Sequence, residues 1–166
     1  MTQTVDIKGS SQATAGEELL QLVSFKIGDE EFGVDILKVQ EINRMLEVTG
    51  VPGAPEFVDG VINLRGKVIP VIPLRRRFGM ERKENDKNTR IIVVELEGKI
   101  VGFVVDGVKE VLRIPRSITE APPPIVAGIR AGYIRAVGRL QDRLLILLDL
   151  ERLLSGEESE EVKLVA

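Results

Sequence analysis

The 166 residues suffice for one domain or two small ones, and their composition removes several kinds of chemistry at once. The chain has no cysteine and no histidine, so disulfides, thiolate nucleophiles, most zinc sites and the usual catalytic triads are excluded. A net charge of -3 and an aromatic content of 4% argue against a general attraction to nucleic acid or membranes. We therefore expect a protein that is not an enzyme, with no catalytic residues, no cofactor and no metal site.

Three regions follow one another along the chain. Residues 1–18 are rich in Thr, Gln, Ser, Ala and Gly and predict a disordered N-terminal arm. Residues 19–154 are dense in Val, Ile and Leu and are punctuated by Gly and Pro, which is typical of short strands in a barrel or sandwich. Residues 155–166 predict an acidic flexible tail. The longest apolar run, Leu144–Leu148, is far short of the ~20 residues that span a bilayer, so we expect no direct membrane insertion.

An internal repeat organises the middle region. Leu22–Arg44 matches Ile91–Arg113 after a shift of 69 positions, and Phe57–Phe78 matches Tyr133–Leu154 after a shift of 76. Two blocks in the same order indicate a duplication, with a first half at about residues 19–79 and a second at about 88–154. The extra residues of the second half fall within Ile114–Gly132, where three consecutive prolines exclude regular structure.

The sequence of each half predicts about five strands and one short helix. One strand ends near Ile36 and another begins near Val39, with at most one helical turn between them, because the matching Asp106-Gly107 reads as a hairpin turn. A second hairpin turns at Arg65-Gly66 in the first half and at Gln141-Asp142 in the second. Short helices follow at Leu74–Phe78 and Leu150–Leu154. The expected fold is therefore mainly β with short helices, with each half supplying enough strands to close a small barrel.

A basic cluster leaves one alternative function open. Arg75, Arg76 and Arg77 are followed by Arg82 and Lys83, which would suit a small β-barrel RNA-binding protein. Glu81, Glu84 and Asp86 dilute that cluster, so we favour the polar face of a short helix and the loop after it.

Four segments carry a family resemblance: EEFGVDILKVQEI at Glu30–Ile42, FVDGVINLRGKVIPVI at Phe57–Ile72, VGFVVDGVKEV at Val101–Val111 and LLILLDLERLL at Leu144–Leu154. Through them the chain closely resembles the CheW family of bacterial chemotaxis coupling proteins over about Leu19–Leu154. The resemblance implies two small five-stranded SH3-like β-barrels packed on one another. One departure is Pro73, which stands where family members commonly carry Asp, as the second half does at Asp149.

The resemblance also implies a function and partners. The chain would be a non-enzymatic adaptor that couples the cytoplasmic tip of a methyl-accepting chemotaxis receptor to the regulatory domain of the histidine kinase CheA. It would be cytoplasmic and recruited to membrane receptor arrays. The family's receptor contacts map onto Val39, Glu41, Gly60, Asn63 and Arg65.

Each of these five residues also has a purely structural interpretation. Val39 and Glu41 recur in the repeat as Val108 and Glu110, as strand residues would. Gly60 is matched by Ala136, which favours close approach of a partner helix over a need for positive φ. Asn63 would suit the flank of a turn, and Arg65 an exposed turn tip. Because Gln141 replaces Arg65 in the second half, we expect that the charge of Arg65 is not needed to build its turn.

Overall fold

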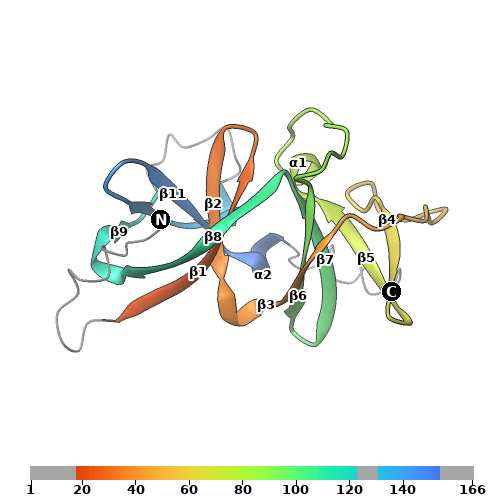
Figure 1. Cartoon of the computed structure of the whole chain (residues 1–166), viewed down its shortest axis with the longest axis horizontal. Helices are drawn as coiled ribbons and strands as arrows, with labels where there is room; N and C mark the ends of the chain where they lie inside the picture. Colours follow the sequence, from red (N-terminus) through yellow and green to blue (C-terminus); the bar gives the residue numbers. More distant parts are fainter. Residues whose placement is uncertain (1–17, 123–130, 154–166) are drawn as a thin grey trace. The chain divides into compact units, whose positions relative to one another are not determined.

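The computed structural model describes residues 18–122 and 131–153 (Figure 1). Nearly all of the predicted N-terminal arm, all of the acidic tail and residues 123–130 of the proline-rich segment therefore lie outside the described residues. The described part of that segment contains a 3-10 turn at Arg116–Ile118 and a short strand at Thr119–Glu120, so the prediction that it has no regular structure is wrong there. The strands are β1 (Leu19–Ile27), β2 (Glu30–Asp35), β3 (Val39–Arg44), β4 (Gly60–Leu64), β5 (Lys67–Pro73), β6 (Arg90–Leu96), β7 (Lys99–Val105), β8 (Gly107–Pro115), β9 (Thr119–Glu120), β10 (Ile134–Arg139) and β11 (Leu144–Leu148). The helices are α1 (Leu74–Arg77) and α2 (Leu150–Leu153), with 3-10 turns η2 (Ile36–Lys38), η3 (Arg116–Ile118) and η4 (Ala131–Tyr133).

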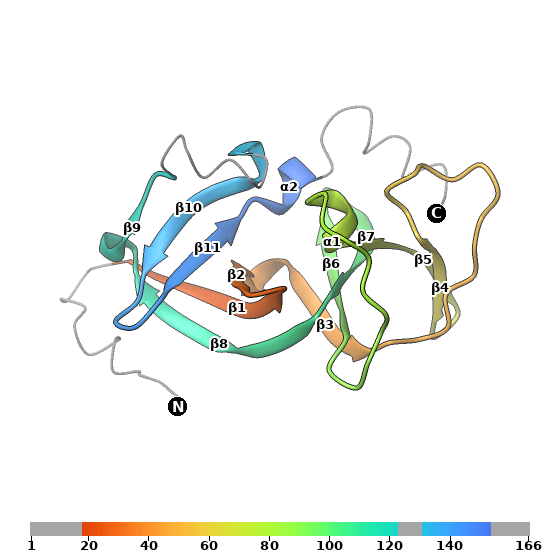
Figure 2. The ribbon, with the colours of Figure 1, turned by 90° about the horizontal axis from the view of Figure 1, so that it is seen from above.

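The chain forms two compact units, each built around one sheet. In unit 1, the described residues are 18–37, 108–122 and 131–149, and its sheet has the strand order β8-β1-β2-β11-β10-β9. In unit 2, they are 38–107 and 150–153, and its sheet has the order β3-β6-β7-β5-β4, as can be followed in Figure 2. The mainly β prediction is confirmed, although hydrogen bonds between strands close neither sheet into a barrel within the described residues.

Strand registers repeat between the two units. Leu22 pairs with Asp35 in unit 1, and Ile91 pairs with Val104 in unit 2, a shift of 69 positions on both strands. In the second block, Val61 pairs with Pro70 and Val137 with Ile146, a shift of 76 on both strands. The structure therefore carries the duplication that the sequence indicated, residue for residue within these hairpins.

The two halves of the sequence exchange strands, which corrects the expectation that each half closes its own barrel. Strands β1 and β2 of the first half lie in one sheet with β8–β11 of the second, while β6 and β7 of the second half lie with β3–β5. The predicted hairpin at Asp106-Gly107 is also wrong. Strand β7 is already flanked by β6 and β5, so it offers β8 no free edge, and the chain leaves unit 2 there. The same argument applies to β2, which β1 and β11 flank, and η2 then leads into β3 as predicted.

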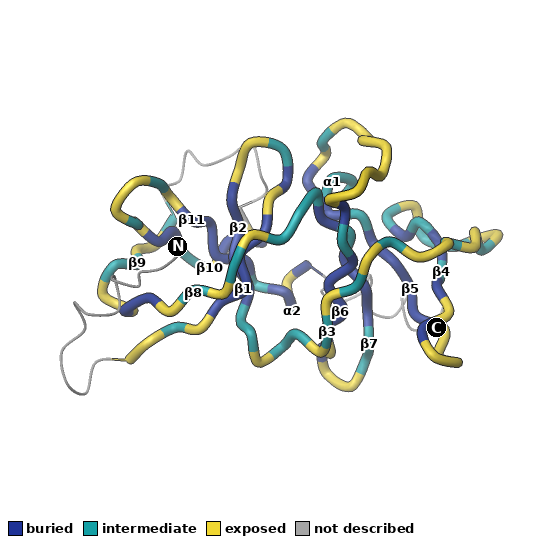
Figure 3. Tube along the Cα trace, viewed as in Figure 1, coloured by how far each residue is buried: buried dark blue, intermediate teal, exposed yellow. Residues whose placement is uncertain are grey.

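Apolar residues of alternating strands fill each unit. The core of unit 2 is formed by Ile62, Leu64, Ile69, Val71, Ile91 and Val93, and a second cluster in unit 1 by Leu22, Ile114, Leu145 and Leu147. Figure 3 shows the resulting change between buried and exposed residues along the strands. Both predicted helices are present, and α1 begins after Pro73, whose φ of -68° suits this position although its side chain caps nothing.

Helices in the described part of the chain are short. None of them has the length and apolar character needed to cross a membrane.

Candidate functional site

All five residues predicted from the resemblance lie in unit 2, on β3 and on the β4–β5 hairpin. Val39 and Glu41 are half-buried on β3, where they alternate with exposed neighbours. Gly60 begins β4, Asn63 lies near its end, and Arg65 follows in the turn. Strands β3 and β4 are the two edges of this sheet, so the predicted residues lie on strands that share no ladder.

An ion pair nevertheless joins the two edge strands at Glu41 and Arg65. The Arg65 guanidinium donates to both carboxylate oxygens of Glu41, with 2.8 Å between Arg65 Nη2 and Glu41 Oε2. Asn43 Nδ2 donates to the same Oε2 at 2.9 Å. Hydrogen bonds from Arg65 and then from Asn43 hold the pKa of Glu41 below its ordinary value, while Glu41 raises the pKa of Arg65.

Water reaches this ion pair, which limits its contribution to the fold. The Arg65 side chain is 70% exposed and that of Glu41 is 25% exposed. Solvent and salt screen charges in such a position, so the pair is available to a partner without being a major source of stability.

The backbone of the hairpin turn presents Arg65 in an unusual conformation. Arg65 has a φ of 53° and Gly66 a φ of 86°, as in the two-residue turns that match the twist of a hairpin. Asn63 Oδ1 accepts a hydrogen bond from the Gly66 backbone N–H at 2.8 Å and so braces the turn. Within the described residues, the matching Gln141-Asp142 turn has no positive φ. The two turns are therefore different in backbone, contrary to the equivalence on which the sequence argument relied.

Gly60 has a role inside the chain. It is buried, and a Cβ placed on it would lie against the carbonyl of Thr49 and 2.8 Å from Val48 Cγ1. Thr49 approaches because it exchanges two backbone hydrogen bonds with Val61, of 2.8 and 2.9 Å, beside the β4 edge. The close approach at Gly60 is thus made by this chain's own backbone, whereas the sequence argument had expected a partner helix, and the φ of 156° at Gly60 is positive, contrary to that argument. A receptor contact there stays a prediction.

Asn43 belongs to the site, and the sequence reasoning missed it. Its amide reaches Glu41 from the same strand, two residues away. The repeat held a signal, since Asn43 is matched by Leu112, a polar residue where the other half carries an apolar one.

A counterpart of this site exists in unit 1. Glu110, which matches Glu41, accepts a hydrogen bond from Arg143 Nη2 at 3.0 Å. Arg143 Nε also donates to Glu31 Oε1 at 2.7 Å, and Lys109 Nζ lies 3.5 Å from that oxygen. The Glu31 side chain is only 6% exposed, so this cluster lies largely inside unit 1.

Acidic side chains that lie close together could bind a metal ion. Residues 18–122 and 131–153 contain no group of three or more Asp or Glu side chains placed to hold a metal ion.

Known proteins share both the sequence and the fold of this chain. Residues 21–158 match the model of the CheW-like domain family. The chain is 42% identical over 153 residues to a chemotaxis protein CheW of Klebsiella aerogenes, covering 92% of this chain and 90% of that protein. It is 36% identical over 152 residues to a chemotaxis protein CheW of Helicobacter pylori, covering 92% of both. The crystal structure of the scaffolding protein TtCheW from Thermoanaerobacter tengcongensis superposes with a TM-score of 0.78 at 36% identity, covering 85% of this chain and 96% of that one.

Proposed function

Because this chain belongs to the CheW family of chemotaxis scaffolding proteins, we propose that it couples a chemoreceptor to the histidine kinase CheA and binds the receptor at the Glu41–Arg65 surface of unit 2. The family resemblance inferred from the motifs is confirmed, and with it the mainly β fold and the scaffolding function without catalysis. The Glu41–Arg65 surface is defined here by Val39, Glu41, Asn63 and Arg65.

The ion pair of Glu41 and Arg65 is the observation that supports this surface. It brings together two of the predicted contacts that are 24 residues apart in the sequence. Arg65 keeps most of its area in solvent, so its planar guanidinium can pair with a carboxylate or with backbone carbonyls of a helical receptor tip. Half-buried Val39 adds apolar area on β3, the strand that carries Glu41.

A partner at this surface would meet a braced arginine. Arg65 is held by Glu41 and by a turn that Asn63 fixes, so less side-chain freedom is lost on binding than for an unpaired surface arginine. The charge arrangement is also directional, with a cation at the tip of the β4–β5 hairpin and a carboxylate on β3, the opposite edge strand of the sheet. Electrostatic complementarity of this kind gives specificity and a faster association rate.

The kinase is expected at a different surface. The family resemblance implies that the regulatory domain of CheA is itself similar to CheW, so the two can pack barrel against barrel. Substitutions on the Glu41–Arg65 surface should then leave kinase binding unchanged.

RNA binding, the alternative that the basic cluster left open, gains nothing from the structure. Arg75 and Arg76 donate to Asp106 and Asp59, and the Arg77 guanidinium lies over the Phe57 ring, 5.0 Å from its centre. These cations are committed to contacts within unit 2, whereas RNA binding needs them turned to a phosphate backbone.

The test is a titration of a chemoreceptor cytoplasmic fragment with Arg65→Glu. We expect receptor affinity to fall at least ~thirtyfold, because the variant loses the arginine and places two carboxylates together. Binding of the CheA regulatory domain and the melting temperature should not change. Lys67→Glu is the matched control, since it makes the same charge change at an exposed position of the same hairpin.

A charge exchange separates receptor contact from internal bracing. The double variant Glu41→Arg, Arg65→Glu can re-form the ion pair with reversed polarity. If the receptor contacts these two charged groups directly, the affinity for the receptor stays low in the double variant. Wild-type receptor affinity in folded Arg65→Glu, or its full recovery in the double variant, would contradict the proposed contact.

A further inference from the structure

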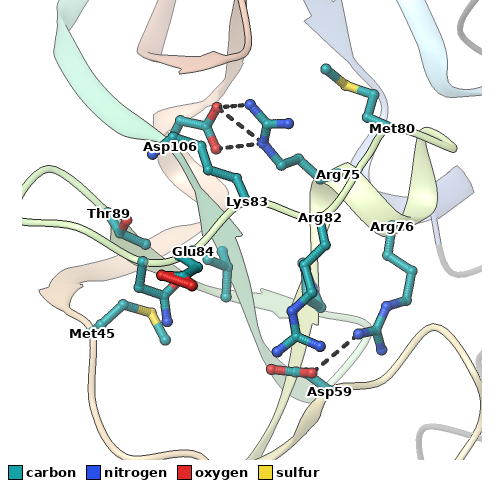
Figure 4. Close-up of a pocket in the computed structure, with 13 residues that line it drawn as sticks. Met45, Asp59, Arg75, Arg76, Met80, Arg82, Lys83, Glu84, Thr89 and Asp106 are labelled. Carbon is teal, nitrogen blue, oxygen red and sulfur yellow. Dashed lines mark hydrogen bonds and ion pairs between the residues drawn. The ribbon is translucent and has the colours of Figure 1, made fainter.

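A cavity of about 350 Å³ in unit 2 is separate from the Glu41–Arg65 surface. It lies between α1, the loop that follows it, and the strands beneath, and Figure 4 shows the side chains around it. This volume is within the range of about 300–1,000 Å³ that small-molecule sites occupy. Pro73, Val104 and Met45 give the cavity an apolar part.

Most of the charges on its wall are already paired. Arg75 donates to both oxygens of Asp106, at 2.7 to 3.2 Å, and to the backbone carbonyl of Glu81 at 3.0 Å, which fastens the loop to α1. Arg76 donates to Asp59 at 3.2 Å. Lys83 also lines the cavity but pairs with Asp86, and its hydrogen bond, followed by that of the Asn88 backbone, lowers the pKa of Asp86 to about 2.

Two opposite charges remain. Within residues 18–122 and 131–153, the side chains of Arg82 and Glu84 make no hydrogen bond or ion pair. In Figure 4 they lie apart: Arg82 points with Arg76 toward Asp59, whereas Glu84 lies beside Thr89 and Met45. At the first end, Arg76 pairs with the Asp59 carboxylate and Arg82 has no partner among the described residues, so that end has a surplus of positive charge, while Glu84 leaves an unpaired negative charge at the other end.

The fold itself does not require this charge arrangement. The repeat places Arg135 at the position of Asp59, Asp149 at Pro73, Glu151 at Arg75 and Leu37 at Asp106. The matching segments therefore build the same secondary structure with different chemistry at these four cavity positions, of which three matches lie in the second half and one, Leu37, in the first. Pro73, the departure noted in the sequence, also removes a carboxylate from the wall and leaves the surplus positive charge uncancelled.

We propose that this cavity binds a small zwitterion, with the ligand carboxylate at Arg82 and Arg76 and the ligand ammonium at Glu84. Charge-assisted hydrogen bonds at both ends set its orientation, and the apolar wall accommodates a short aliphatic spacer. A second binding site for a small ligand would thus accompany the scaffolding function on the same unit.

The test uses the full chain with methionine methyl groups labelled for NMR, since Met45 and Met80 line the cavity. Glycine, 4-aminobutyrate and 6-aminohexanoate are titrated to find the spacer length that fits. We expect at least one to shift both methyl resonances with a dissociation constant on the order of 1 mM, as befits a ligand this small. The acid and the amine that each lack one charged group, such as butyrate and butylamine for 4-aminobutyrate, should bind at least ~tenfold more weakly.

Variants assign the two ends. Arg82→Gln and Glu84→Gln should each weaken the best zwitterion at least ~tenfold, while Lys67→Gln, an exposed residue of unit 2 outside the cavity, should have no effect. Because Arg82 and Glu84 are exposed, both variants should keep the wild-type amide spectrum elsewhere. The proposal is overturned if no zwitterion of the series shifts the methyl resonances at ~50 mM, a concentration far above the expected dissociation constant. It is equally overturned if butyrate alone binds as well as 4-aminobutyrate, which would indicate a simple anion site, or if Glu84→Gln binds as the wild type does.

Discussion

Glu41 in unit 2 and Glu110 in unit 1 occupy matching strand positions, and each meets an arginine from the matching hairpin. The two arginines differ in place. Arg65 stands in the turn itself, whereas Arg143 stands two positions later, where the first half carries Lys67. That shift takes the guanidinium from 70% exposed at the tip to 30% exposed, against a carboxylate of Glu31 that is 6% exposed.

The difference shows how one backbone can support two kinds of ion pair. The cluster of unit 1 includes a buried carboxylate, which must keep its cation because an unpaired buried charge is costly. The pair of unit 2 is screened by water, so either partner can be exchanged at little cost to the fold. Repeated position alone therefore did not reveal which glutamate is structural and which is free to contact a partner.

Removal of Arg143 should have the largest effect on stability. In Arg143→Met, Glu31 keeps only Lys109 at 3.5 Å, so we expect the free energy of unfolding to fall by about 3 kcal/mol. Urea denaturation measures the change. Arg139→Met is the control, since Arg139 and Glu120 form a well-exposed pair in the same unit. Equal free energies of unfolding in the two variants would contradict the conclusion that the ion pairs of Arg143 are structural.

Gly60→Ala should have the next largest effect. The new Cβ meets the Thr49 carbonyl and Val48, so the strand edge must shift, at a cost of about 2 kcal/mol. Gly50→Ala serves as the control, because nothing lies within 4 Å of a Cβ there. Thermal denaturation of both variants measures the difference. Equal melting temperatures of Gly60→Ala and Gly50→Ala would mean that the backbone at Thr49 shifts at little cost.

Glu41→Gln should have the smallest effect on the fold. Because the pKa of Glu41 is lowered in the folded protein, its ion pair stabilises the fold above the ordinary pKa near 4.5. That stabilisation disappears as the pH falls through the lower, folded value. The melting temperatures of wild type and Glu41→Gln should therefore differ by a small constant amount at neutral pH, and the difference should shrink as the pH falls below the ordinary value of 4.5. A difference that grows on acidification would contradict the assignment of Glu41 as the charged partner.

The sequence predicted the strands and their repeat well because local signals specify them. Alternating apolar residues, Gly and Pro placed the hairpins, and the same signals placed α1 and α2. The exchange of strands between the halves had no local signal. Asp106-Gly107 has the composition of a hairpin turn, and only the occupied edges of β7 prevent β8 from pairing there.

The candidate site was predictable in part. The resemblance selected Glu41 and Arg65 from separate segments, but their direct ion pair depends on the curvature of a sheet whose edges share no ladder. Asn43 was not predicted, because the hydrogen-bond partner of an asparagine in a strand depends on side chains whose positions the sequence does not give. At Gly60 the sequence argument expected a partner helix, whereas the segment that lies close to it is Thr49 of this chain, which could not be named without tertiary structure.

The exchange of strands has a consequence for synthesis on the ribosome. All five strands of unit 2 lie within residues 38–107, so its sheet can form as soon as that stretch has emerged. Strands β1 and β2 emerge earlier, yet their partners β8 and β11 come last. The N-terminal hairpin must therefore wait with an unpaired apolar edge while unit 2 folds, which is the interval in which nascent β proteins are exposed to aggregation. The charges on Lys26, Glu30 and Glu31 of that hairpin suit the delay, since charged residues on a waiting edge discourage pairing with another chain.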